Sequence, residues 1–455
     1  MQTDRDKTDT LPRTVGLRDL LLLSTGGMIG SAVFFFPAFT GQWVGPASII
    51  AWLAAGVGMV SIALCYTELA TAFPESGGPA VFPAETLGPN PLIRRFFSYL
   101  EGTSYALGWV FGVAVSAWYV ANYLGSIPAL SGVRGHTVLF GLLSIAASLF
   151  ITLLGIDVTK RTNLVLTALI LAVLTVVAAV GISNGTPENM TPFFTGSSTQ
   201  FFASIGVAIT GYGAWTVVPA AAGEVENPSR TIPRAIVGSL VLTTVFYTSV
   251  VLALHLTVPP SAFENGNLVM IAPLSAVTTN AGFPLFANYA LPLAALVAIF
   301  TTMLVGMTGS ARVLCSLAER GTFPTAFAAT SDRTNAPYVA LCAIAIAAAA
   351  VVVGKQVLGG IVLAALVGTV LPYAINIASF VGLRVYRRDV TPTFYAPGGL
   401  VTAAIALGFL SLLATALSVD HPVIAAFTVV VLLVGFVVQY IYNDMTTASD
   451  HSNAD

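Results

Sequence analysis

The amino-acid sequence predicts an all-α membrane protein with about twelve transmembrane helices. The first observation is the composition: of 455 residues, 56% are hydrophobic and 8% are charged, and the mean hydropathy is +0.87. Soluble domains carry about 25% charged residues, so lipid must cover much of this surface. The second observation is a series of apolar runs along the whole chain. The third is a one-sided distribution of lysine and arginine.

The apolar runs are long enough to cross a bilayer, which takes about 20 helical residues, and Gly, Pro, Asn or charged residues separate them. They cover residues 16–42, 46–72, 95–127, 136–156, 162–183, 200–223, 233–258, 285–318, 337–354, 358–386, 399–418 and 421–443. Segments 1–15 and 444–455 are polar and are predicted to be tails. The loop 261–283 is apolar enough to pack over the helices as a lid.

The positions of the basic residues support this topology independently. With twelve spans, all of the 18 lysines and arginines except Arg134 and Lys355 fall on one side of the membrane. Cytoplasmic loops carry the excess of basic residues. One helix more or fewer would scramble this asymmetry. We therefore predict a multi-pass protein of the plasma membrane with both termini in the cytoplasm.

The same residues exclude several classes of protein. A net charge of -2 without a basic cluster gives no indication of nucleic-acid binding. The cysteines Cys65, Cys315 and Cys342 lie in apolar segments without metal-ligand spacing, which favours buried thiols. Neither an H-E-x-x-H motif nor a Ser/His constellation occurs, so an enzyme is not expected. The sequence does not indicate an oligomeric state.

Two of the predicted helices contain clusters of small residues in mid-membrane. The first run contains GGMIGSAVFFFP, and the sixth contains TGYGAW followed by Pro219. Glycines weaken a helix where lipid cannot satisfy free backbone groups, so an interruption there must face a protein-lined cavity. Paired interruptions in the two halves of a chain are typical of inverted-repeat transporters with a site near the midplane. Close helix packing at small residues is the alternative.

An interrupted helix offers free amides at one end and free carbonyls at the other. The amides of Ile29, Gly30 and Ser31 are candidates for binding a carboxylate. The carbonyls of Gly27, Met28 and residues 211–213 are candidates for accepting hydrogen bonds from an ammonium group. This combination suits a zwitterion.

Four segments resemble motifs of one family of permeases. They are GMIGSAVFFFPA, ELATAFPESGGPAVFPAETLG, GYGAWTVVPAAAGEVENPSRTIPRAI and GSARVLCSLAERGTFP. The chain resembles the amino acid, polyamine and organocation (APC) family from about residue 15 to residue 443. This resemblance implies inverted five-helix repeats at 16–183 and 200–386, with discontinuous first and sixth helices and two peripheral helices at 399–443. It also implies amino-acid transport by alternating access.

Carried over to this chain, the resemblance places the substrate at the two interruptions. Together with the free backbone groups, it gives the candidate residues Gly27, Met28, Ile29, Gly30, Ser31, Ala32, Gly211, Tyr212, Gly213, Ala214 and Trp215. Ala32 and Ala214 stand where the family usually has glycine, so a small or repositioned substrate is expected. Thr216 occupies a position that is often Glu. Ile170 lies near the place where many proton-linked relatives have a Lys.

Ionisable residues are scarce within the predicted spans, where such residues usually serve function. They are Glu68, Glu101, His255 and Arg312, all toward helix ends. We expect Glu68 to tie an inner gate to a basic residue. Without a charge at the midplane, a substrate with a neutral side chain is the simplest inference. Tyr212, Trp215 and Trp118 are candidates for lining an apolar pocket, and Trp118 is equally a packing residue.

A coupling ion is suggested by similarity to sodium-coupled relatives of this fold. Hydroxyls at Thr301 and Thr302, with the carbonyls of Ala298, Gly26 and Ile29, would form an oxygen site for sodium. Threonine in a membrane helix more often bonds to its own helix, which is the alternative. Proton-coupled or exchange transport of another small organic solute, and a non-transporting amino-acid sensor, are the competing functions.

Overall fold

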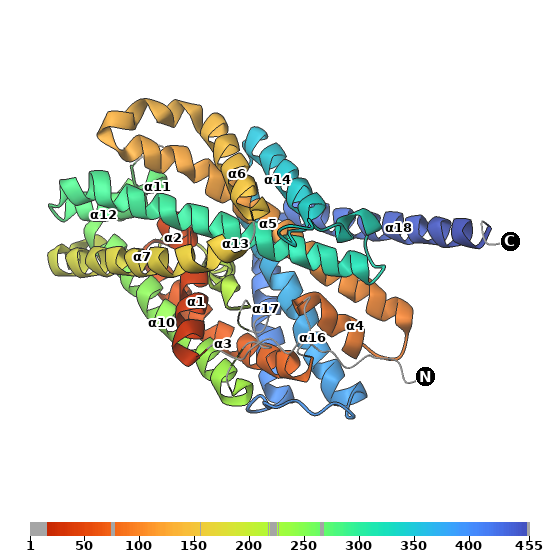
Figure 1. The fold of residues 1–455 in the computed structure, drawn as a ribbon. Coiled ribbons are helices and arrows are strands. Elements are labelled where there is room, and N and C mark those ends of the chain that lie inside the picture. Colours follow the sequence, from red (N-terminus) through yellow and green to blue (C-terminus); the bar gives the residue numbers. More distant parts are fainter. Residues whose placement is uncertain are drawn as a thin grey trace.

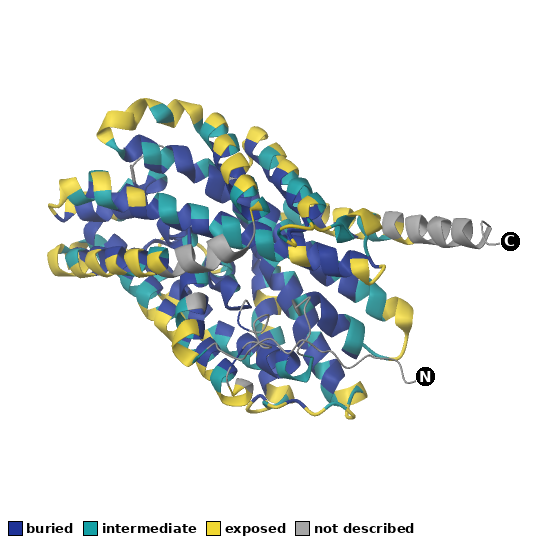
Figure 2. Cartoon of the chain, viewed as in Figure 1, coloured by how far each residue is buried: buried dark blue, intermediate teal, exposed yellow. Residues whose placement is uncertain are grey.

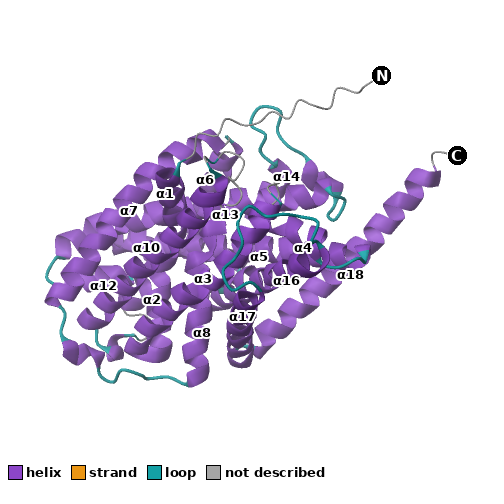
Figure 3. Cartoon of the chain, turned by 90° about the horizontal axis from the view of Figure 1, so that it is seen from below, coloured by secondary structure: helices purple, strands orange, loops and turns teal. Residues whose placement is uncertain are grey.

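A computed structural model describes residues 16–73, 78–154, 156–216, 218, 225, 227–263 and 268–452. Helices pack side by side into one bundle (Figure 1), and the loops run over its surface (Figure 3). No β-strand occurs among the residues described. The predicted all-α fold is therefore confirmed.

Each predicted apolar run corresponds to a helix or to a pair of helices. The helices are α1 (Leu17–Met28), α2 (Ala32–Val44), α3 (Ser48–Ala72), α5 (Pro91–Ser126), α6 (Thr137–Leu153), α7 (Ile156–Asn184), α8 (Ser198–Ala208), α10 (Pro228–Thr257), α13 (Leu291–Glu319), α14 (Tyr338–Val353), α15 (Val357–Ala365), α16 (Leu371–Tyr386), α17 (Leu400–Asp420) and α18 (Pro422–Ser452). In the described part of the chain, eight helical segments are long and apolar enough to cross a membrane, and shorter apolar helices accompany them. The last helix continues through most of the predicted tail 444–455.

The outside of the bundle is apolar, as a lipid-facing surface must be. Large side chains such as Val165, Ile346, Val401 and Phe427 are more than half exposed. Figure 2 shows the exposed residues at the periphery and the buried residues inside. The central helix is α5, which packs against α6, α13, α14 and α15.

Short helices close the two ends of the bundle. In the predicted lid, α11 (Leu268–Ile271) and α12 (Pro273–Asn280) pack against α2, and α12 also packs against α7 and α10. The described part of the lid, residues 261–263 and 268–283, therefore packs on the helices as its apolar content predicts, and residues 264–267 lie outside the described residues. At the opposite end, α4 (Val81–Thr86) packs against α5 and α16, and this helix was not predicted.

Ion pairs among the described residues gather at the α4 end, which we call the charged end. Glu68 is fully buried, and Arg384 holds both of its oxygens, at 2.6 Å from Nε and 2.7 Å from Nη2. Glu85 lies 3.3 Å from Arg387 and 3.8 Å from Arg320. The expectation that Glu68 pairs with a basic residue is confirmed.

Candidate binding site

The first interruption separates α1 from α2 and confirms the break predicted from the glycines. Helix α1 ends at Met28, and α2 begins at Ala32. Each of the three amides between them already has an acceptor. The amide of Ile29 donates to the Thr25 carbonyl and that of Gly30 to the Met28 carbonyl, each at 2.8 Å.

The third amide is held from another helix. The Ser31 amide donates to Oγ1 of Thr302, 2.8 Å away on α13, and the Ser31 hydroxyl lies 2.9 Å from the hydroxyl of Ser116 on α5. The prediction of free amides is therefore wrong for this conformation, because two of the amides donate to carbonyls of α1 and the third donates to a hydroxyl of α13. A side-chain hydroxyl can rotate away, so the Ser31 amide is the one that a carboxylate can reach most easily.

The second interruption follows α8. The α-helical geometry stops at Ala208, and residues Ile209–Thr216 form a 3₁₀ helix, η5. A 3₁₀ turn is tighter than an α turn and its hydrogen bonds are poorer, which is common at functional hinges. Pro219 lies outside the described residues.

The two interruptions face one cavity of about 90 Å³. A single water needs at least roughly 10–15 Å³, so the cavity is large enough for a small solute or several waters. Its lining comprises Gly27, Met28, Gly30, Ser31, Ala32, Phe35, Phe36, Gly108, Trp109, Gly112, Val115, Ser116, Thr210, Gly211, Gly213, Ala214, Thr302, Ile361, Ala364, Gly368, Thr369 and Tyr373. None of these side chains carries a charge. Most of the predicted site residues are thus brought together.

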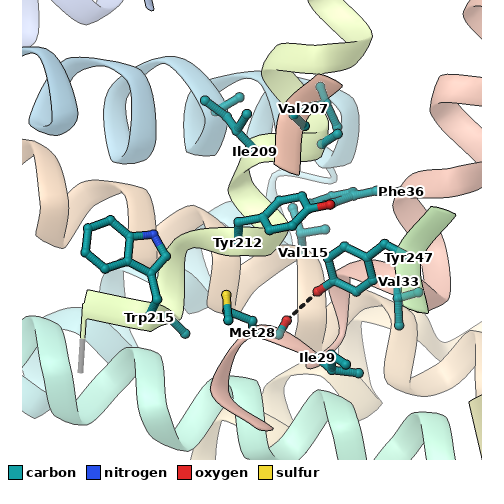
Figure 4. Packing of buried hydrophobic residues seen from close by; sticks show 14 of the residues in the cluster. Met28, Ile29, Val33, Phe36, Val115, Val207, Ile209, Tyr212, Trp215 and Tyr247 are labelled. Carbon is teal, nitrogen blue, oxygen red and sulfur yellow. Dashed lines mark hydrogen bonds between the residues drawn. The ribbon is translucent and has the colours of Figure 1, made fainter. Parts of the chain in front are cut away.

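Three predicted site residues lie outside this lining, namely Ile29, Tyr212 and Trp215. The Tyr212 hydroxyl donates to the Trp52 carbonyl at 3.2 Å, and the Trp215 ring packs edge-on against Tyr66, with centroids 5.0 Å apart. Figure 4 shows both rings extending from η5 to opposite sides. Trp118 does not line the cavity either.

The aromatic lining comes instead from other helices. Phe35 and Phe36 on α2, Trp109 on α5 and Tyr373 on α16 form it. The prediction that Tyr212 and Trp215 line an apolar pocket is therefore wrong, and of the two alternatives for Trp118 the structure agrees with packing against the core. The periodicity of a sequence does not show which way side chains point from a 3₁₀ turn.

Tyr247 on α10 connects the two interruptions and was not predicted. Its hydroxyl lies 2.5 Å from the Met28 carbonyl (Figure 4) and 2.9 Å from the Gly211 carbonyl. The residue is fully buried, so no water competes for these bonds. A single hydroxyl thus occupies two of the carbonyls that were predicted to accept hydrogen bonds from an ammonium group.

The two alanines that depart from the family pattern fit against glycines across the cavity. A Cβ placed on Gly27 would lie 3.1 Å from the Ala214 methyl, and one on Gly211 would lie 3.3 Å from the Ala32 methyl. The Ala32 methyl of the first interruption therefore packs on Gly211 of the second, and the Ala214 methyl of the second packs on Gly27 of the first. This packing narrows the cavity from both sides.

The predicted sodium ligands lie beside the first interruption. Both Thr301 and Thr302 donate to the Ala298 carbonyl at 2.9 Å, so they bond to their own helix. A Cβ on Gly26 would meet the Thr167 side chain of α7, and Ile29 is buried. The sodium site stays a prediction.

Aromatic clusters flank the cavity on both sides. Toward the charged end, Tyr66, Trp215 and Tyr373 pack together, with centroids 5.0–6.0 Å apart. Toward the lid, Phe35 stacks on Tyr119 at 4.5 Å. A site between two interrupted helices, flanked by aromatic clusters, suits alternating access.

Two interrupted helices around a common cavity, in an apolar helical bundle, define the class of membrane transporters built on discontinuous helices. The amino acid permease family model matches residues 15–452. The chain therefore belongs to the amino acid permease family, and it is a transporter and not an enzyme.

Three proteins to which the chain is similar are named for different substrates. The chain is 27% identical to a branched-chain amino acid permease of Bacillus subtilis, over 95% of this chain and 94% of that protein. It is 26% identical to a methylthioribose transporter of Bacillus subtilis, over 89% and 88% of the two chains. It is 30% identical to the chloroplastic cationic amino acid transporter 9 of Arabidopsis thaliana, over 70% of this chain and 57% of that protein.

Proposed function

We propose that this protein is a secondary transporter of amino acids with small or aliphatic neutral side chains. The observation that carries this proposal is the chemistry of the cavity: polar backbone at both interruptions and uncharged, mostly apolar side chains elsewhere. Apolar pockets with few polar groups bind apolar ligands and orient them by those groups.

The backbone groups match the two ends of an amino acid. The carbonyls of Met28 and Gly211 lie close enough to share the Tyr247 hydroxyl, so one ammonium group can reach both. The Ser31 amide, at the start of α2, is available to a carboxylate once Thr302 turns away. The side chain of the substrate would then lie among Phe35, Trp109 and Tyr373.

A cationic substrate fits this cavity less well. A second ammonium group buried there would need a carboxylate partner, and no lining side chain is acidic. The branched-chain permease is thus a better guide to the substrate than the cationic transporter. The proposal also includes the plasma membrane as location and the charged end as the cytoplasmic side, because basic residues gather at that end.

A thermal-shift panel of the twenty amino acids on the purified protein tests this proposal. A ligand that binds only the folded state raises its stability by mass action. We expect stabilisation by alanine, valine, leucine or isoleucine and none by arginine or lysine. Methylthioribose belongs in the panel, because one relative is named for it. Stabilisation by arginine or methylthioribose alone would refute the proposal.

A further inference from the structure

A second buried carboxylate, Glu101 on α5, has no part in the site described above. It is fully buried. Its Oε1 accepts a hydrogen bond from Nδ2 of Asn376 on α16 at 3.0 Å, and no donor of the described residues reaches its Oε2. Ionisable groups inside a membrane protein are costly to bury and are usually functional.

Comparison with Glu68 shows what Glu101 lacks. Both side chains are fully buried, but Glu68 has Arg384 on both of its oxygens, whereas Glu101 has no basic partner among the described residues. An ionised carboxylate without a cation is strongly disfavoured in such surroundings, and the group takes up a proton instead. Glu101 is therefore a neutral acid in this conformation.

The hydrogen bonds around Asn376 lead to the same conclusion by a different route. Its Nδ2 donates to Glu101 and to the Tyr66 hydroxyl, at 3.0 and 2.8 Å. Its Oδ1 is buried without a donor, like Oε2 of Glu101. Each of these two acceptors lacks a hydrogen, and a proton on the carboxyl group would turn Oε2 from an acceptor without a partner into a donor.

The neighbours of Glu101 connect it with the cavity. Tyr373 lies one helical turn before Asn376 on α16 and lines the cavity. Tyr66 packs on Trp215 of η5, with ring centroids 5.0 Å apart. A rearrangement of the second interruption would therefore move the groups that surround Glu101.

From this geometry we propose that Glu101 is the proton-carrying site that couples substrate transport to a proton gradient. The inference rests on the proposed function and deepens it. In the conformation described here Glu101 holds its proton. When the charged end opens, the O–H bond breaks, the proton passes to water on that side, and the carboxylate remains hydrated until it is protonated again.

The other ionisable groups around Glu101 do not supply a competing site. They are the phenols of Tyr66 on α3, Tyr105 on α5 itself and Tyr373 on α16, and the Glu68–Arg384 pair nearer the charged end, whose charges offset each other. On α13, which also packs against α5, Cys315 and Glu319 hydrogen-bond to each other, and none of the described ion pairs joins Arg312 to Glu101. Glu101 is the unpaired carboxylate among them.

Proteoliposomes with an internal pH dye test the proposal. The external probe is an equimolar mixture of L-alanine, L-valine and L-leucine, and counterflow of the same labelled amino acids is measured in parallel. We expect the wild type to acidify the lumen with uptake, and Glu101→Gln to lose more than tenfold of this acidification while keeping counterflow. Glu85→Gln, the same chemical change at a partly exposed position, should retain both.

The outcomes separate the two proposals. Absence of counterflow in the wild type would reject the proposed function and this inference with it. Counterflow without acidification, or uptake driven by sodium alone, overturns only the role of the proton. Wild-type acidification in Glu101→Gln overturns the role of Glu101. Should Glu101→Gln not fold, Asn376→Ala is the deciding variant. It keeps the Glu101 carboxyl group but removes its hydrogen-bond donor, so the pH midpoint of uptake must shift. An unshifted midpoint overturns the proposal.

Discussion

Replacing Tyr247 by phenylalanine removes the hydroxyl that joins the two interrupted helices. The Tyr247 ring packs edge-on against Trp52 and Tyr212, with centroids 5.0 and 5.1 Å apart, and phenylalanine preserves these contacts. The substitution therefore isolates the hydrogen bonds to Met28 and Gly211.

The expected cost follows from those bonds. A hydrogen bond contributes about 0.5–1.5 kcal/mol net, and a buried polar group left without a partner costs about 1–3 kcal/mol. One hydroxyl hydrogen serves both carbonyls, so we expect Tyr247→Phe to destabilise the substrate-free protein by about 1–3 kcal/mol. Its unfolding midpoint should fall accordingly.

Substrate should reverse this loss. In the wild type an ammonium group must displace the Tyr247 hydroxyl from the carbonyls of Met28 and Gly211, whereas in Tyr247→Phe the carbonyls are vacant. We expect the stabilising amino acid to bind about fivefold more tightly, equivalent to about 1 kcal/mol. The assay is a thermal shift measured against substrate concentration for both proteins.

Tyr212→Phe is the matched control. It removes a hydroxyl from the same aromatic cluster, but that hydroxyl donates to Trp52, away from both interruptions. This variant should lose some stability and keep the substrate affinity of the wild type. Weaker substrate binding in Tyr247→Phe, or equal behaviour of the two variants, would refute the reasoning.

Three further substitutions probe the rest of the account. Gly27→Ala should reduce uptake strongly, because the new methyl approaches a neighbouring methyl to 3.1 Å, whereas Gly213→Ala meets only the far end of a tyrosine at 3.7 Å and should be tolerated; equal uptake by both contradicts this. Glu68→Gln should lower the unfolding midpoint, because it breaks the buried ion pair with Arg384. The loss should be moderate, because the Arg384 side chain is about a third exposed and can be hydrated instead; an unchanged midpoint contradicts this. Thr302→Ala removes the hydroxyl that accepts a hydrogen bond from the Ser31 amide at the first interruption. Uptake should therefore change both in sodium buffer and when choline replaces sodium. A loss of uptake in sodium buffer alone would instead support the predicted sodium site.

The interruptions were predictable because their cause is local. Glycines at 26, 27 and 30 and at 211 and 213 weaken a helix wherever they occur, and polar backbone in a membrane must then face protein. The partners of those backbone groups were not predictable. Tyr247 lies on an ordinary apolar helix 36 residues from Gly211, and only tertiary packing brings its hydroxyl there.

The same distinction explains the errors at the site. The identity of Trp215 as an aromatic residue beside an interruption was clear, but the direction of its side chain depends on the 3₁₀ geometry of η5. Glu101 was recognised as an intramembrane acid, yet its lack of a basic partner becomes visible only when α5 and α16 are seen together. The sequence thus located the helices and their breaks, while the packing decided which side chains meet.

Counterflow in proteoliposomes tests the central claim most directly, because it requires transport but no ion gradient. Vesicles loaded with unlabelled L-leucine should accumulate labelled L-leucine transiently, and external L-valine should compete while L-arginine should not. Failure of every neutral amino acid to support counterflow, in protein shown to be folded, would contradict the claim that the cavity between the two interrupted helices carries amino acids.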